Sequence, residues 1–163
     1  MQASHGKIKS LLKESSLIAK KSRGQNFLAN ERVLERMADA AGIDKGDVVL
    51  EIGPGLGMLT QVLASRCKKL IAVEIDKGLC GFLKLKFSSA KNTEVVLSDI
   101  LKFDIAGLAD REDSRVKVIG NIPYYITTPI ITYLIKARGS VSSAYLTIQK
   151  EVAQRITASP GTK

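Results

Sequence analysis

The sequence predicts an α/β fold in which a parallel β-sheet is covered by helices on both faces. Two observations support this prediction: short apolar runs recur at regular spacing along the chain, and helical stretches lie between them. Strands that alternate with helices are typical of parallel sheets with both faces buried. A length of 163 residues is enough for one domain that buries about two-thirds of its unfolded surface.

Each expected element has a local signal. Apolar residues recur near the 3.6-residue period over 7–20, which predicts a short amphipathic helix. Asn30 is a typical N-cap and Gly42 a typical end for a helix over 31–41. The expected strands are 48–52, 70–73, 94–97, 116–119 and 144–148. The other expected helices are 58–65, 77–87 and 129–136.

The reactive side chains exclude several kinds of chemistry. The only histidine is His5, and the two cysteines, Cys67 and Cys80, form no C-x-x-C pair. A zinc site needs about four ligands, so no metal is expected, and neither is a histidine-based nucleophile. The cysteines are expected to be buried apolar residues in a reducing cytosol. No apolar run approaches the roughly 18 residues of a membrane helix, and no secretory signal is expected.

The formal net charge of +9 is unevenly distributed, because residues 1–30 alone carry six basic side chains against one acidic side chain. Two other basic groups are Arg66, Lys68 and Lys69, and Lys84, Lys86 and Lys91. Such charge suits a surface that binds nucleic acid, since neutralised phosphates supply much of that affinity. Solvated surface with a general lysine bias explains the charge equally well. A transit peptide is a third interpretation of the N-terminus.

Glycines at positions 53, 55 and 57 lie directly after the first expected strand and before an expected helix. Glycines there let the backbone turn tightly and approach a ligand, whose polar end meets the amides of the helix N-terminus. Glu74, twenty-one residues beyond Gly53, stands where an acid binds ribose hydroxyls. Together they indicate a nucleoside-containing cofactor, although the spacing differs from the G-x-G-x-x-G of NAD sites. A glycine turn needed only for packing is the alternative.

Asp99 adds a second acid just after the third expected strand. Its carboxylate can accept a hydrogen bond from an adenine amino group, or it can cap the following turn, and the residue alone favours neither role. The ligand role gains support from Gly53 and Glu74. All three are expected at the carboxyl ends of strands, where open α/β sheets bind ligands.

The segment 120–125, Gly-Asn-Ile-Pro-Tyr-Tyr, follows the fourth expected strand. Asn121 and a backbone carbonyl held by Pro123 provide two hydrogen-bond acceptors, and Tyr124 provides a flat face. Two acceptors and an aromatic face suit a planar base that bears an exocyclic amine and has left its stack. A strand-ending turn with a buried tyrosine is the alternative, which the order of the motifs along the chain disfavours.

With these motifs in this order, the sequence resembles the rRNA adenine N6,N6-dimethyltransferase family (KsgA type) from about Lys20 to its last residue. The resemblance rests on segments 24–28, 51–57, 73–76, 98–99, 121–124 and 149–155. It implies a Rossmann-like methyltransferase fold that depends on S-adenosylmethionine. It also implies methylation of the exocyclic amine of adenines in small-subunit ribosomal RNA, a step of ribosome biogenesis.

The resemblance also implies roles for residues of this chain. A basic segment, 1–29, is expected to close over the cofactor site of a methyltransferase domain, 30–163. Asn121 and Tyr124 are the expected catalytic residues. Acceptors from Asn121 and the Ile122 carbonyl favour a pyramidal amine nitrogen aimed at the methyl group, and Tyr124 stacks on the base. The expected cofactor-binding residues are Gln25, Asn26, Leu28, Gly53, Gly55, Glu74, Asp99 and Asn121.

The family continues beyond the end of this sequence with two more strands and a helical C-terminal domain. The sheet is therefore expected to be truncated after its fifth strand, which becomes an exposed edge. The expected partner is the RNA of the small ribosomal subunit, with no membrane and no metal. A cytoplasmic monomer is expected, and a mitochondrion or plastid is the alternative location.

Three other functions stay open. The erythromycin-resistance methyltransferases act on large-subunit rRNA and share similar motifs, although the glycine segment and 124–129 favour the KsgA type. A non-catalytic nucleic-acid-binding relative of the transcription-factor-B type would keep the fold. An NAD-dependent dehydrogenase is disfavoured by the glycine spacing and by the lack of a suitable histidine.

Overall fold

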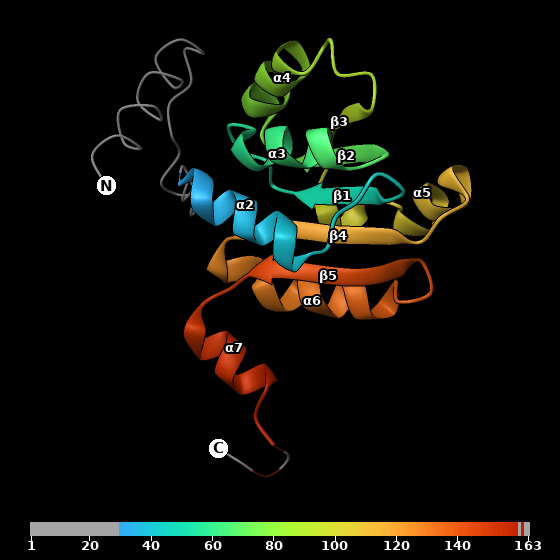
Figure 1. The fold of residues 1–163 in the computed structure, drawn as a ribbon. Helices are drawn as coiled ribbons and strands as arrows, with labels where there is room; N and C mark the ends of the chain where they lie inside the picture. The colour runs from blue at the N-terminus through green and yellow to red at the C-terminus, as the bar shows by residue number, and fades with distance from the viewer. Residues whose placement is uncertain (1–29, 160, 162–163) are drawn as a thin grey trace.

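In the computed structural model of the chain, which describes residues 30–159 and 161, a parallel five-stranded sheet lies between two layers of helices (Figure 1). The strand order is β3-β2-β1-β4-β5, and every neighbouring pair is parallel. The strands are β1 (Val48–Ile52), β2 (Lys69–Glu74), β3 (Thr93–Leu97), β4 (Val116–Asn121) and β5 (Val141–Thr147). The order reverses between β1 and β4, and their carboxyl ends form a switch point. The predicted fold class is confirmed.

The described helices pack on opposite faces of the sheet, except α7, which follows β5 and extends away from the sheet (Figure 1). They are α2 (Glu31–Ala40), α3 (Met58–Arg66), α4 (Lys77–Lys86), α5 (Ile105–Glu112), α6 (Thr127–Lys136) and α7 (Lys150–Ile156), with short 3-10 turns η2 (Ile100–Lys102) and η3 (Tyr124–Ile126). Buried residues of α2, α3 and α4 meet one face, and those of α5 and α6 meet the other. No described helix has the length and apolar character needed to cross a membrane.

Residues of β1 alternate between the two layers of the core. Val49 packs with α2 and α3, whereas Leu50 packs in the cluster that contains residues of α5 and α6. All five residues of β1 are buried, which explains the continuous apolar runs in the sequence. Cys67 and Cys80 are also buried, as predicted, and burial raises the pKa of the Cys67 thiol to about 11.

Local signals set most helix ends correctly. The Asn30 side chain accepts a hydrogen bond from the Arg32 amide (3.1 Å), and Gly42 has a φ of +56°, so the predicted ends of α2 are confirmed. Two helices were not predicted. In α5 the Asp104 side chain caps the Gly107 amide, but Gly107 itself weakens the helical pattern. The other, α7, is seven residues long and buries none of them, although Val152, Ala153 and Ile156 recur at helical spacing.

The fifth strand differs most from its expected position. It covers Val141–Thr147 instead of 144–148, and its first residues, Val-Ser-Ser, show no apolar run. Backbone pairing decides this start, because Val141 lies opposite Val116 and a register irregularity follows between Val116 and Lys117. As predicted, β5 is an edge of the sheet. The helix predicted over 7–20 lies outside the described residues.

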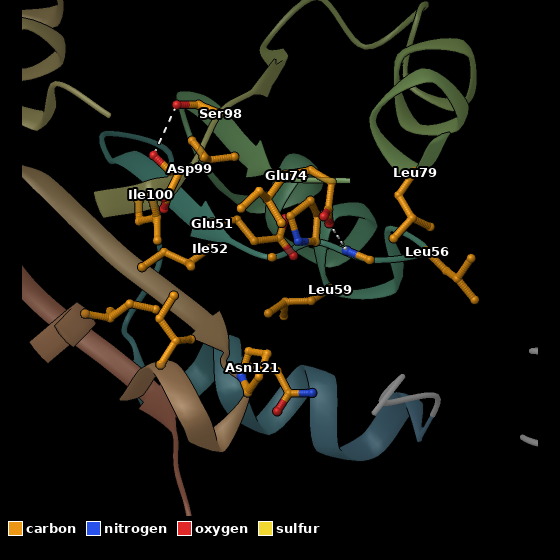
Figure 2. A pocket seen from close by; sticks show the side chains of 18 of the residues that line it. Glu51, Ile52, Leu56, Leu59, Glu74, Leu79, Ser98, Asp99, Ile100 and Asn121 are labelled. Carbon is orange, nitrogen blue, oxygen red and sulfur yellow. Dashed lines mark hydrogen bonds between the residues drawn. The ribbon is translucent and has the colours of Figure 1, made fainter. Parts of the chain in front are cut away.

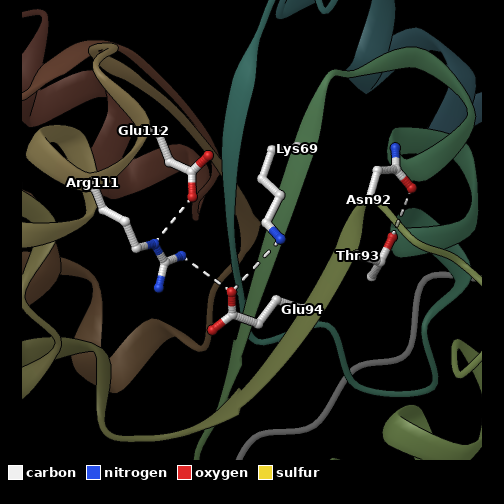
Figure 3. Close-up of polar contacts among 6 residues, drawn as sticks. All are labelled: Lys69, Asn92, Thr93, Glu94, Arg111 and Glu112. Atoms are coloured by element: carbon white, nitrogen blue, oxygen red, sulfur yellow. Dashed lines mark hydrogen bonds and ion pairs between the residues drawn. The ribbon is translucent and has the colours of Figure 1, made fainter.

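Ion pairs neutralise part of the basic group formed by Arg66, Lys68 and Lys69. Arg66 contacts both Glu35 and Asp39 of α2. Lys69 lies 3.8 Å from Glu94, which also accepts a hydrogen bond from Arg111 (3.1 Å; Figure 3). Exposed pairs of this kind add about 0–1 kcal/mol of stability each. A cation held in such a pair also attracts other anions less strongly.

Candidate functional site

A cavity of about 150 Å³ lies at the carboxyl ends of β1 to β4, at the switch point of the sheet (Figure 2). We call it the first cavity. Its walls include residues that the sequence motifs singled out at the carboxyl ends of four strands, among them Gly53, Gly55, Glu74, Asp99 and Asn121. The topology therefore brings these five predicted residues to one site. Gln25, Asn26 and Leu28 lie outside the described residues.

The glycine loop, residues 53–57, forms one wall through its backbone. All three glycines have positive φ, and the last of them, Gly57 (φ +74°), precedes α3. A Cβ on Gly57 would lie 2.7 Å from atoms of both Leu83 and Phe87, so the loop packs against α4 without room for a side chain. Packing thus needs glycine at position 57, whereas Gly53 and Gly55 border the first cavity, so the two sequence interpretations do not exclude each other.

Glu74 ties the second strand to the glycine loop. Its carboxylate accepts hydrogen bonds from the Gly55 amide (3.2 Å) and the Asp76 amide (2.9 Å), and its side chain is buried (Figure 2). Burial raises the pKa of Glu74, and the two amides oppose that rise. The carboxylate holds the loop in shape and borders the first cavity.

Asp99 performs the capping role that the sequence left open. Its side chain accepts a hydrogen bond from the Leu101 amide (3.0 Å) at the start of η2. The same residue borders the first cavity beside Ser98, whose hydroxyl donates to the Asp99 carbonyl (3.1 Å). Capping fixes the position of the carboxylate at the cavity wall. Hydrogen bonding to an adenine amine stays a prediction.

Asn121, the last residue of β4, borders two cavities. The second cavity is lined by 121–124 on one side and 147–149 on the other. Gly120 lets β4 pass close to β1, since a Cβ there would lie 2.9 Å from the Ile52 carbonyl oxygen. Asn121 therefore lies between the first cavity, on the side of the glycine loop, and the second cavity, on the side of β5.

The two tyrosines that follow point to different cavities. Tyr125 borders the first cavity and Tyr124 borders the second. Their rings pack edge to face with centroids 6.0 Å apart, and more than half of each side chain is exposed. The interpretation of Tyr124 as a buried tyrosine in a turn is wrong, because 61% of it is exposed. An exposed aromatic face is available for stacking.

Two residues of the site were missed by the sequence interpretation. Glu51 of β1 is 1% exposed, borders the first cavity, and has one carboxyl oxygen, Oε2, with no hydrogen-bond partner. Lys86 of α4 donates to the carbonyls of Leu56 (2.9 Å) and Gly57 (3.4 Å). The signal for Glu51 was present in the sequence, because a glutamate in the apolar run of a buried strand needs a reason.

The first cavity fits S-adenosylmethionine by the chemistry of its walls. Glu74 and Asp99 place carboxylate oxygens at its wall that could accept hydrogen bonds from ribose hydroxyls and an adenine amine, and the unpartnered oxygen of Glu51 could accept one from an ammonium group. Apolar side chains such as Ile52, Ile75 and Ile100 line the rest. Among residues 30–159, no group of three His, Cys, Asp or Glu side chains lies close enough to hold a metal ion.

The sequence comparisons find relatives whose names denote methylation of ribosomal RNA. Residues 17–163 match the protein family described as "Ribosomal RNA adenine dimethylase". The "Ribosomal RNA small subunit methyltransferase A" of Alkaliphilus metalliredigens is 44% identical over 162 residues, which cover 98% of this chain and 56% of that protein. The chain thus spans about half the length of the curated relatives it matches.

Two solved structures are also similar. The dimethyladenosine transferase from Plasmodium falciparum is 34% identical, with a TM-score of 0.71 over 84% of this chain and 48% of that one. The 23S rRNA methyltransferase ErmE is 33% identical, with a TM-score of 0.73 over 81% of this chain and 51% of that one.

Proposed function

Because the chain belongs to the ribosomal RNA adenine dimethylase family, a family of S-adenosylmethionine-dependent methyltransferases, we propose that it takes part in methylating the exocyclic amine of adenines in small-subunit rRNA. The cofactor occupies the first cavity and the target adenine enters the second. The observation that carries this proposal is the position of Asn121, which borders both cavities. A residue at that boundary can contact a methyl donor on one side and an acceptor base on the other.

When bound, S-adenosylmethionine supplies a methyl group on a sulfonium that is already activated, so the protein has only to place the two reactants. The Asn121 side-chain oxygen and the Ile122 carbonyl accept hydrogen bonds from the amine and orient its lone pair. Tyr124 stacks on the base that has left its helix, and its π-face favours the positive charge that develops. No side chain has to act as a strong base.

The remaining assignments belong to the same proposal. Gly53, Gly55, Glu74 and Asp99 bind the cofactor from the glycine-loop side. The basic segment 1–29 closes over it with Gln25, Asn26 and Leu28. Exposed basic residues such as Lys84 contact rRNA phosphates, and the protein acts as a cytoplasmic monomer. The number of phosphate contacts can be read from a plot of log affinity against log salt concentration, whose negative slope becomes steeper with each contact.

Two measurements on the 163-residue chain test the proposal. Calorimetric titration with S-adenosylhomocysteine should show one site. Transfer of a radiolabelled methyl group to small ribosomal subunits that lack the modification should label adenines of their RNA. A folded chain that does not bind S-adenosylhomocysteine would contradict the cofactor assignment. Binding without any transfer would confine the function of this chain to holding the cofactor.

A second candidate is methylation of large-subunit rRNA, which the similarity to ErmE supports. The same assay distinguishes the two substrates when small and large subunits are offered side by side. Labelled adenines in the large subunit alone would favour the second candidate. Label in the small subunit, mapped to adenines by nuclease digestion, supports the proposal. A nicotinamide-dependent absorbance change would instead indicate a dehydrogenase.

A further inference from the structure

Glu51 is a buried carboxyl group that has no role in the proposed transfer step. It is the fourth residue of β1, it is 1% exposed, and it borders the first cavity. Its Oε2 atom is buried without a hydrogen-bond partner. A buried polar atom of this kind destabilises the fold unless a ligand or another group satisfies it, so its place at a ligand cavity calls for a function.

The surroundings of Glu51 favour the protonated carboxyl in the cavity without ligand. Burial raises its pKa to about 8, and the carboxylate of Glu74 on β2 acts in the same direction. The Thr60 hydroxyl on α3 and the ammonium of Lys86 on α4 oppose this rise without cancelling it. The neighbours from β4 and α2, Ile119 and Leu34, carry no charge. At pH 7 the group therefore carries a proton.

We propose that Glu51 releases this proton when the ammonium group at the amino-acid end of the cofactor enters the first cavity, so that cofactor binding is coupled to proton release. The inference rests on the proposed function. The O–H bond of the carboxyl breaks, the proton passes to a buffer base, and the carboxylate accepts a hydrogen bond from the charged amino group of the ligand. A nearby positive charge favours the ionised form of a carboxyl, which supplies the coupling.

Glu74 is less suited to this role, although burial raises its pKa too. Both of its oxygens already accept backbone amides, from Gly55 and Asp76, and these bonds stabilise its ionised form. Glu51 differs because Oε2 has no such donor. The arriving ligand therefore gains more from ionising Glu51 than from any change at Glu74.

The test counts protons during binding. The 163-residue chain is titrated calorimetrically with S-adenosylhomocysteine at pH 7 in phosphate and in Tris, whose ionisation enthalpies differ. A group with a pKa of about 8 is about 90% protonated at pH 7, so we expect about 0.9 proton released per ligand. 5′-Deoxy-5′-methylthioadenosine lacks the amino-acid end and should release almost none. Between pH 6 and 8 the dissociation constant of S-adenosylhomocysteine should fall by up to about tenfold per pH unit.

Two variants identify the group. Glu51→Gln keeps the shape of the protonated side chain and should bind with no proton release and with a pH-independent affinity. His5→Gln removes the one other side chain with an ordinary pKa near 7 and should leave the proton count unchanged. Wild-type binding without proton release, or equal release by Glu51→Gln, would overturn the inference and leave the proposed function intact. Failure of the folded wild-type chain to bind would overturn both, and the ligand comparison needs no variant to fold.

Discussion

At the carboxyl edge of the sheet, the β1–β2 half is held by more hydrogen bonds and buried side chains than the β4–β5 half. We call the first the firmly built half and the second the open half. On the β1–β2 half, the glycine loop is bonded to its neighbours: Gly55 to Glu74, and the Leu56 carbonyl to Lys86. Leu56 and Glu74 are both buried there. On the β4–β5 half, Tyr124 and Tyr125 are more than half exposed, and the adjoining β5 is an edge strand.

This difference matches the two ligands that the halves are proposed to bind. A small cofactor of fixed shape is bound best by a site formed in advance, because little ordering is then needed on binding. A base that leaves a large RNA needs an open approach and an accessible aromatic face. Substitutions on the first half should therefore change cofactor affinity and stability together, and those on the second half should change transfer.

The largest expected effect is on the open half. We expect Asn121→Ala to lower the rate of methyl transfer by about 10²–10³-fold, because it removes an oriented hydrogen bond to the reacting amine. The affinity for S-adenosylhomocysteine should fall much less. Initial rates of radiolabel transfer and calorimetric dissociation constants separate the two effects. Tyr124→Phe, which keeps the aromatic face, should retain most of the activity that Tyr124→Ala loses. A rate for Asn121→Ala close to that of the wild type would contradict the assignment of methyl transfer to the open half.

On the firmly built half, Gly57→Ala should destabilise the protein. Its φ of +74° is unfavourable for alanine, and the new Cβ would lie 2.7 Å from atoms of Leu83 and Phe87. We expect a loss of about 2–3 kcal/mol in the free energy of unfolding, with weaker cofactor binding. Urea denaturation measures the first effect. Gly81→Ala is the matched control: its Cβ meets nothing within 4 Å, and alanine in α4 should stabilise by about 0.5–1 kcal/mol.

The pH dependence of stability should report the buried carboxyl on the same half. The pKa of Glu51 rises on folding from 4.5 to about 8, so the folded state binds more protons than the unfolded state within that range. Stability therefore falls as pH rises from about 4.5 to 8, by at most about 1.4 kcal/mol per pH unit, and levels off above. In Glu51→Gln this slope should be smaller. The part that remains comes from Glu74, whose pKa is also raised. Glu151→Gln, on the exposed α7, should keep the full slope in urea denaturation across pH 5–8.

The sequence indicated the places of Gly53 and Glu74 more directly than the place of Asn121 between two cavities, for a physical reason. The signals for Gly53 and Glu74 are local: a strand ends, the backbone turns, and an acid follows the next strand. The topology then necessarily brings the carboxyl ends of parallel strands together. The role of Asn121 at the boundary of two cavities is not local, since the second cavity also needs the ends of β5 and η3.

The residues that the sequence could not assign depend on packing between distant elements. In the sequence, Lys86 is one of three lysines in a basic group. Only the packing of α4 beside the glycine loop lets it donate to the carbonyls of that loop. Likewise, the sequence does not show that Arg66 and Lys69 form ion pairs. The fold places Glu35 and Asp39 beside Arg66, and Glu94 beside Lys69. Charge counted along a sequence overestimates the charge that is available to a partner.

The smallest expected effect tests whether Lys86 helps to build the firm half. Its ammonium donates to the carbonyls of Leu56 and Gly57 and lies 5.3 Å from the centre of the Phe87 ring. Because the C=O and N–H groups of a planar trans peptide point in opposite directions, a fixed Gly57 carbonyl also fixes the amide of Met58, which borders the first cavity. Loss of these contacts should loosen the loop without unfolding it.

Lys86→Met keeps the apolar stem against Phe82 and Phe87 and removes only the charge and the hydrogen bonds. We expect a loss of about 1 kcal/mol in the free energy of unfolding and a roughly threefold to tenfold weaker affinity for S-adenosylhomocysteine. Removal of the cation should also raise the pKa of Glu51 further, so that more of the protein carries the proton before binding. Lys84→Met changes an exposed lysine of the same helix and should alter neither quantity. If the two variants bind alike, the loop keeps its shape through Glu74 and the packing of Gly57 alone, and the firmness of this half comes from β2 and not from α4.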